Sequence, residues 1–434
     1  MKPRTILTLG FAAFAVYAFP GYMGWDSMTQ LAQARRHVYS DDHPPAMAVL
    51  WRVLEVFVHG PLLMWLVGAI PFVLGVYYLL QTRLPARAAA IATVAVLWFP
   101  PVGTVVAAIY KDTTMAAFLM AAVPLLVARR NAVGLLLVVA ATAMRWNAIA
   151  ATLPIVVLLY HHGSLAGARR YAAAAGAWLA VTAIAMLLNT VLADEHKRYW
   201  YKTQALMDIA DTVANARDYS DAELADELAG VDVIPHDHVQ DAFRRIYKPV
   251  DFRHLDRGDT QIFVAPETDA GRDAVARAWK RVIADNPGAY LHYRWDNFVM
   301  LLRLDHAVYN NAPITSVLRF HEDYDYLGHD LEPGRVQGWL LEGNRLISRT
   351  PVFDPYVYVA LALVLLWLAR RDRVASALLL SGLAYEAAWF VLAPTADYRY
   401  SEWLVACTIV GGILVWARRR ATRRASSRRS DTGS

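Results

Sequence analysis

The sequence predicts an all-α, polytopic membrane protein, and three observations carry that prediction. Hydrophobic residues make up 57% of the 434 residues, and the mean hydropathy is +0.28. Several apolar runs approach the ~20 residues that a helix needs to cross a bilayer. Basic residues cluster in the short segments between these runs, which is typical of cytoplasmic loops. A soluble domain of this length has no reason to be so apolar.

We expect about ten membrane spans, with nine or eleven as alternatives because the fifth and sixth are short and poorly separated. The expected spans are residues 5–21, 61–81, 86–103, 113–128, 132–146, 148–161, 171–193, 352–369, 374–393 and 401–417. The first has the basic start and apolar centre of a signal peptide, but we interpret it as an uncleaved helix because many further spans follow.

The segment 46–58 is too short to cross a membrane and carries Arg52 and Glu55. Its apolar residues recur at helical spacing, which predicts an amphipathic helix along the membrane interface.

Basic residues in short loops set the expected orientation. If Lys2 and Arg4 are cytoplasmic, ten spans place every basic cluster of a short loop on the same side. These clusters are Arg83 with Arg87, Arg129 with Arg130, Arg169 with Arg170, residues 369–373 and the arginine-rich tail. Both termini are therefore expected in the cytoplasm. We expect a multi-pass protein of the bacterial inner membrane, and the Ala- and Arg-rich composition suits a high-GC bacterium.

This topology divides the chain into four parts. They are an N-terminal transmembrane region, 1–193, with a first outer loop, 21–60; a polar extracytoplasmic domain, 194–350; the last three spans, 351–417; and a basic cytoplasmic tail, 418–434. The polar stretch is long enough for one globular domain. Helix-like patches at 221–228 and 271–304 predict that it is mostly helical, with short strand-like pieces such as 260–266.

Charge and cysteine content exclude some classes of function. Much of the net charge of +5 lies in the tail, which follows an apolar helix and indicates a membrane anchor rather than a nucleic-acid partner. The single cysteine, Cys407, excludes a disulfide framework and a thiolate metal site.

The first outer loop carries polar residues beside the membrane, where charges are costly and are often functional. Asp26 follows Trp25 just beyond the first span. It can act as a general base at the membrane boundary, or cap a helix, or lie in solvent. The motif "DDHPP" adds Asp42 and His43, each a metal ligand, a substrate contact or a capping residue ahead of a helix that Pro44 and Pro45 begin.

The segment "YKDTT" places Lys111 and Asp112 where the fourth span begins. Asp112 is suited to cap that helix and complement its dipole. Alternatively, Lys111 binds a phosphate at the helix N-terminus, where free N–H groups favour anions. In that interpretation Asp112 orients a cation or an acceptor.

Two further outer segments offer cations. The segment "RWN" places Arg145 and Asn147 between two short spans, where the arginine binds substrate or reaches lipid phosphates. The segment "DYRY" places Arg399 between Tyr398 and Tyr400. Aromatic residues are common at membrane interfaces, but a guanidinium can hold phosphate through two hydrogen bonds.

Each signal is weak alone, but one face gathers carboxylates (Asp26, Asp42, Asp112) and phosphate-binding cations (Lys111, Arg145, Arg399). A carboxylate can take the proton of an acceptor hydroxyl, and the cations can stabilise a departing phosphate. The combination predicts transfer from a lipid-linked phosphate donor.

The motifs "PGYMGWDS", "DDHPP", "YKDTT", "RWN" and "DYRY", in this order, resemble those of the GT-C membrane glycosyltransferases, which include protein O-mannosyltransferases and aminoarabinose transferases. The pattern is similar above all to a poorly characterised bacterial branch. The resemblance covers roughly 1–193 and 352–417. It implies that the donor is a sugar on polyprenyl phosphate, that the acceptor is an envelope glycan, lipid or protein, and that the active site is periplasmic. It also implies that the reaction inverts the anomeric centre of the sugar.

The resemblance also implies roles for residues. Asp26 matches the acidic base of the first outer loop, and Asp112 matches the second acidic motif. Many relatives carry an acidic pair where this chain has Asp26 alone, so the need for a divalent metal ion, with Asp26, Asp112 and His43 as candidate ligands, stays open. Three other functions compete: a transporter or flippase of lipid-linked sugars, a scaffold that binds an envelope partner through 194–350, and an enzyme of the same fold that transfers a non-sugar group or ligates glycan chains.

Overall fold

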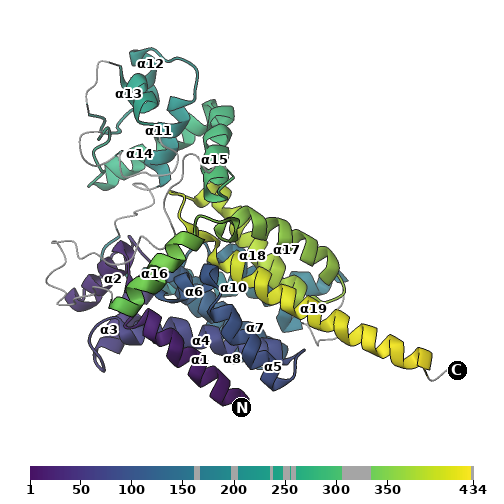
Figure 1. The fold of residues 1–434 in the computed structure, drawn as a ribbon. Helices are drawn as coiled ribbons and strands as arrows, with labels where there is room; N and C mark the ends of the chain where they lie inside the picture. The colour runs from purple at the N-terminus through teal and green to yellow at the C-terminus, as the bar shows by residue number, and fades with distance from the viewer. Residues whose placement is uncertain are drawn as a thin grey trace.

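The computed structural model describes residues 1–160, 167–196, 204–234, 238–247, 255, 261–304 and 334–431, and within them the chain is mostly helical (Figure 1). A bundle of apolar helices forms the larger part. Its helices are α1 (Pro3–Ala18), α4 (Leu62–Gln81), α5 (Ala86–Leu97), α6 (Pro100–Val106), α7 (Lys111–Val127), α8 (Asn131–Met144), α9 (Ala148–Val156), α10 (Gly167–Leu192), α17 (Pro355–Ala369), α18 (Arg373–Leu392) and α19 (Glu402–Asp431). Each predicted apolar segment coincides with one of them or with a bent or broken pair.

Four helical segments of the described residues have the length and composition to cross a membrane: α4, α10, α18 and Tyr398–Thr422. The pair α5 and α6 would make a fifth, although the two helices meet at 76° next to Pro100. Other apolar helices are shorter, such as α8 with 14 residues. Length and composition therefore support four or five spans, and the ten-span topology stays a prediction.

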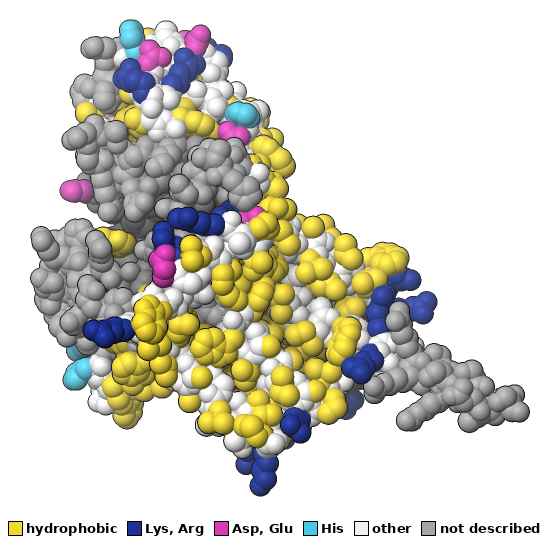
Figure 2. Space-filling model, viewed as in Figure 1, with side chains coloured by type: hydrophobic (Ala, Val, Ile, Leu, Met, Phe, Trp, Pro, Cys, Tyr) yellow, Lys and Arg dark blue, Asp and Glu magenta, His cyan; other side chains and the backbone are white. Residues whose placement is uncertain are grey.

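The two ends of the bundle differ in their polar residues. At one end Asp372 caps α18 through the N–H groups of Val374 and Ala375, both 3.2 Å from Oδ1. Its other carboxylate oxygen lies 3.4 Å from Arg83 and 3.4 Å from Arg418. Three of the segments expected on the cytoplasmic side thus meet at Asp372. Figure 2 shows Lys and Arg side chains at this end, below a broad hydrophobic surface.

A second, smaller group of helices stands beyond the opposite end of the bundle (Figure 1). It comprises α11 (Leu206–Ala214), α12 (Asp221–Glu227), α13 (Val239–Ile246), α14 (Asp269–Asp285) and α15 (Pro287–Leu301). These helices share their own apolar core. A capping box of Ser220 and Glu223 begins α12. The predicted helical patch 271–304 is indeed helical, but it is divided into α14 and α15 at Pro287.

A buried polar contact joins this outer group to the bundle. Arg294 on α15 is fully buried and forms an ion pair with Asp208 on α11. Its guanidinium also donates to the carbonyl oxygen of Ala393 at 3.1 Å, and Asn297 donates to the same oxygen at 3.2 Å. Ala393 ends α18, so the outer group is attached directly to the backbone that leads to Arg399.

The first outer loop contains more structure than its sequence indicates. It holds β1 (Tyr22–Met23), α2 (Trp25–Arg36) and α3 (Pro45–Glu55), and α3 is the predicted amphipathic helix with slightly earlier ends. Strand β1 pairs in parallel with β2 (Ala108–Ile109), with Met23 opposite Ile109. Gly21 makes the turn into β1 at a φ of +112°, where a Cβ would meet Trp65 at 2.6 Å.

Candidate active site

The two-stranded ladder brings two segments far apart in the sequence to one place. Strand β1 leads into α2, whose first turn holds Asp26, and β2 leads into α7, whose first two residues are Lys111 and Asp112. The hydroxyl of Ser27 donates to the carbonyl oxygen of Ile109 and ties the two helix starts together. Asp26 and Lys111 therefore face each other because the backbone pairing places them so.

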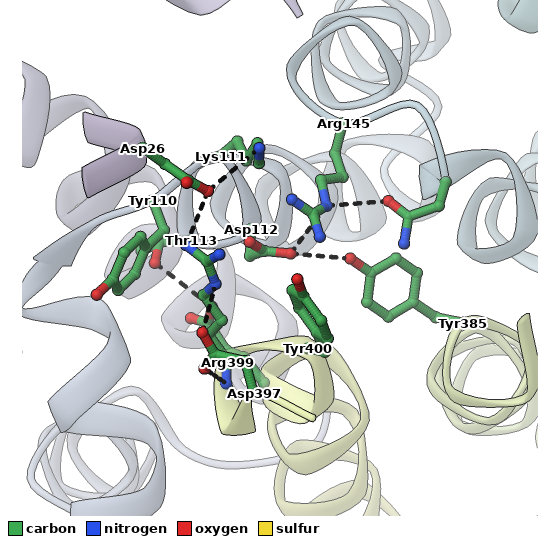
Figure 3. Close-up of polar contacts among 12 residues, drawn as sticks. Asp26, Tyr110, Lys111, Asp112, Thr113, Arg145, Tyr385, Asp397, Arg399 and Tyr400 are labelled. Carbon is green, nitrogen blue, oxygen red and sulfur yellow. Dashed lines mark hydrogen bonds and ion pairs between the residues drawn. The ribbon is translucent and has the colours of Figure 1, made fainter. Parts of the chain in front are cut away.

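Asp26 lies at the centre of the first of two adjoining clusters (Figure 3). Its carboxylate is 3.0 Å from Arg399 and 3.2 Å from Lys111, and Nε2 of His43 lies 3.8 Å away. The Asp26 side chain is 21% exposed, so solvent reaches part of its surface. Gly24, not Asp26, is the N-cap of α2, and the Asp26 side chain is held by cations.

Burial and neighbouring charges set the protonation states of Asp26 and His43. Burial alone would raise the pKa of Asp26, but Arg399 and then Lys111 outweigh it and hold that pKa well below its usual range. Burial and then the Lys111 ammonium lower the pKa of His43 to about 3, so its ring is neutral. Because Nδ1 of His43 lies 2.8 Å from Nζ of Lys111 and accepts its hydrogen bond, the ring proton is on Nε2.

Asp112 anchors the second cluster, which is deeper. Its side chain is 1% exposed and accepts from Nε of Arg145 at 3.0 Å and from the hydroxyl of Tyr385 at 3.2 Å. Nε of Arg145 also lies 3.0 Å from Oδ1 of Asn147. The predicted helix-capping role of Asp112 is not observed, because Tyr110 is the N-cap of α7 and its side chain makes no capping bond.

Aromatic rings join the two clusters. Tyr400 stacks on Trp389 with ring centroids 4.0 Å apart. The guanidinium of Arg145 lies 5.2 Å from the Tyr400 ring, and that of Arg399 lies 5.4 Å from the same ring. Figure 3 shows Tyr400 between the two arginines. Such contacts fix the planes of the guanidinium groups and so limit which oxygens they can reach.

The structure brings together seven of the residues that the sequence singled out: Asp26, His43, Lys111, Asp112, Arg145, Asn147 and Arg399. Tyr400 belongs with them through its ring. Tyr398 does not, because its hydroxyl donates to the carbonyl oxygen of Pro101 and its ring packs on Phe353. Asp42 lies in the turn that precedes His43.

Sequence reasoning missed two aromatic residues of α18, Tyr385 and Trp389. They are four residues apart, one turn on the same face of the helix. Glu386 between them is a carboxyl inside an apolar run, which is a sign of function that the sequence does contain. Its oxygen accepts from the hydroxyl of Ser401 at 2.8 Å, next to the Arg399 segment.

The carboxylates of the two clusters are already paired with cations. Three carboxylates (Asp26, Asp112, Asp397) face three cations (Lys111, Arg145, Arg399), so the charges already balance with His43 neutral. Among the described residues, no three His, Cys, Asp or Glu side chains are grouped to share a metal ion. The candidates Asp26, Asp112 and His43 thus lie beside ammonium and guanidinium groups that repel a divalent cation.

Comparison with protein-family models, with curated proteins and with solved structures finds no match to this chain.

Proposed function

We propose that this chain is a membrane glycosyltransferase of the GT-C type. It transfers a sugar from polyprenyl phosphate to an envelope acceptor at the periplasmic face of a bacterial inner membrane. The observation that carries the proposal is the meeting of Asp26 with Lys111 and Arg399 at the end of the bundle that bears the outer helical group. Apolar helices beside it supply the membrane anchor, and the sequence motifs supply the resemblance.

The two cationic groups nearest Asp26 are suited to a lipid phosphate. A guanidinium offers two parallel donors to a phosphate, and an ammonium offers a compact charge. Lys111 and Arg399 now neutralise Asp26. A donor phosphate in reach of both would share their charge, and the pKa of Asp26 would then rise toward the range of a useful base.

The reaction then balances as a displacement at the anomeric carbon. Asp26 takes the proton of the acceptor hydroxyl, whose oxygen forms the new bond to the anomeric carbon. The bond from that carbon to the phosphate oxygen breaks, and its electron pair leaves with the polyprenyl phosphate. Lys111 and Arg399 stabilise this departing charge. Attack on the side opposite the leaving group inverts the configuration of the anomeric carbon.

The second cluster is suited to positioning the acceptor. Arg145 is held by Asp112 and by the Tyr400 ring, and Nδ2 of Asn147 is a buried donor without a partner in the described residues. Such a donor has a free hydrogen bond for a hydroxyl group. We assign Asp112, Arg145 and Asn147 to the sugar or acceptor side and Lys111 and Arg399 to the phosphate side.

The first test measures transfer of label from a panel of polyprenyl-phosphate sugars, in membranes that carry the wild type or Asp26→Asn. Loss of a general base should lower transfer by about 10²- to 10⁴-fold. Asp218→Asn is the matched control, because Asp218 pairs with Arg244 on the exposed surface of the outer group. Equal transfer by the wild type and Asp26→Asn would remove Asp26 as the base. Uptake of the lipid-linked sugar without transfer would favour the flippase.

A further inference from the structure

The helix α16 (Arg335–Ile347) has no buried residue, although it lies against the outer end of α1 (Figure 1). Gln337 donates to the carbonyl oxygens of Tyr17 and Phe19 at 3.2 and 2.6 Å. Asn344, two turns further on, donates to the hydroxyl of Tyr17 at 3.2 Å. One face of α16 is therefore fixed to α1 by polar contacts.

The remaining surface of α16 is divided into an apolar and a charged sector. Val336, Trp339 and Leu346 follow one another at helical spacing, and Trp339 is 75% exposed. Glu342 and Arg345 form an exposed ion pair on the charged sector. In a helix with this pattern, exposure of the apolar sector to water is unfavourable, and its burial in a lipid interface is favourable.

The outward surface of α1 continues the apolar sector. Leu9, Val16 and Phe19 are each more than half exposed. Figure 2 shows hydrophobic side chains gathered over this region of the molecule. The apolar sector of α16 is thus continuous with a surface that α1 presents to lipid if α1 crosses the membrane as predicted.

A groove of about 540 Å³ runs between these two helices. Its α1 wall is Ala12, Ala15, Val16 and Phe19, and the first turn of α16 forms the other wall with Arg335. The lining is mainly hydrocarbon and includes one cation, Arg335. This lining matches a lipid chain, and Arg335 is suited to reach the phosphates of neighbouring phospholipids.

The groove is also close to Asp26 along the chain. Phe19 is followed by Pro20, Gly21 and β1, and then by the first turn of α2. Seven residues span at most about 25 Å even when fully extended. A donor whose phosphate is held at Lys111 and Arg399 can therefore pass its chain onto the surface of α1.

We propose that α16 lies in the outer lipid leaflet and that the groove between α1 and α16 holds the polyprenyl chain of the donor. This assignment rests on the proposed function for the identity of the chain. It names a substrate site that the charged clusters do not contain, since they bind only the head of the donor.

Two labelled sites test the assignment in phosphatidylglycerol–phosphatidylcholine vesicles. Cys407 is fully buried, so a new cysteine is the accessible thiol among the described residues. A benzophenone on Val16→Cys should crosslink to added polyprenyl phosphate several-fold more than one on Leu187→Cys, an equally exposed position on α10. Equal crosslinking at both positions, or a crosslink at Val16→Cys to phospholipid alone, would overturn the polyprenyl site.

Spin labels test the position of α16. A label at Trp339→Cys should be relaxed by oxygen, which partitions into lipid, and one at Arg345→Cys by a water-soluble nickel complex. Equal access of the nickel complex to both labels would place α16 in water and end the proposal. Neither readout needs catalysis. Crosslinking without sugar transfer from any donor would therefore refute the glycosyltransferase and leave the groove assigned.

Discussion

Replacing Arg294 by leucine should destabilise the outer group of helices, α11 to α15, by about 3–5 kcal/mol, because it leaves a buried charge without its partner. Arg294 and Asp208 are both fully buried. The Asp208 carboxylate would keep its hydrogen bond from Trp279, at 2.8 Å, but lose its ion pair with the Arg294 guanidinium. The carbonyl oxygen of Ala393 would keep only the donor from Asn297.

The loss of stability in Arg294→Leu should depend on pH. Burial raises the pKa of Asp208 to about 6, against the opposing effect of Arg294. The pKa of Asp208 is higher in the folded protein than the value of 3.8 in the unfolded chain. Asp208 therefore does not lower the free energy of unfolding below about pH 4, and lowers it progressively as the pH rises to about 6. Two pKa units correspond to about 3 kcal/mol. Without Arg294 the pKa of Asp208 rises further, so the deficit of the variant should keep growing above pH 6.

Pulse proteolysis across a urea series, in detergent-solubilised full-length protein at acidic and at slightly basic pH, measures this difference through cleavage within 204–304. Arg281→Leu is the control, because Arg281 pairs with Asp226 at the exposed surface of the same group. That pair should contribute at most about 1 kcal/mol. If Arg294→Leu shifts the urea midpoint no further than Arg281→Leu does at basic pH, the reasoning about the buried ion pair is refuted.

Two other predictions concern packing and protonation. Gly75→Ala should destabilise the bundle by about 1–3 kcal/mol, because the new Cβ would lie 2.5 Å from the backbone of Met120. Gly176→Ala should not destabilise it, because nothing lies within 4 Å of the new Cβ. The thermal midpoints of the two detergent-solubilised variants measure this difference, and equal midpoints would contradict it. Because the pKa of folded His43 is lowered from 6.5 to about 3, the wild type should lose stability as pH falls below about 6.5, and His43→Gln should lose less over the same range in a thermal-shift series.

The helical part of the fold followed from the sequence because apolar runs and their basic flanks are local signals. The division at Pro287 and the helix α2 in the first outer loop were not anticipated. The ladder of β1 and β2 was not predictable, since each strand has two residues and no pattern of its own. It forms only when α1 packs on α5 and on Trp65 of α4, and α4 packs on α7, so that the two loops come within hydrogen-bonding distance.

The candidate site was predicted in its charged members and missed in its aromatic ones. Asp26, Lys111 and Arg399 attract notice because charges beside a membrane need partners. Tyr385 and Trp389 lie in an apolar run, where aromatic residues are ordinary, and only the fold places them at Asp112 and Tyr400. The opposite happened with Tyr398, whose sequence neighbours are in the site while its ring points to Phe353.

The pairing between α7 and the last helix, α19, bears on how the chain is made. Thr113, at the start of α7, donates to Glu402, at the start of α19, across 289 residues of sequence. A ribosome adding about 5–20 residues per second needs roughly 15 to 60 s for that stretch. Throughout this interval α7 has emerged while the partners of Asp26 and Thr113 on the last segment do not yet exist. During it Asp26 can pair with Lys111 but not with Arg399, and Thr113 can donate to Val105 but not to Glu402, so the contacts made by the C-terminal segment are the last to form.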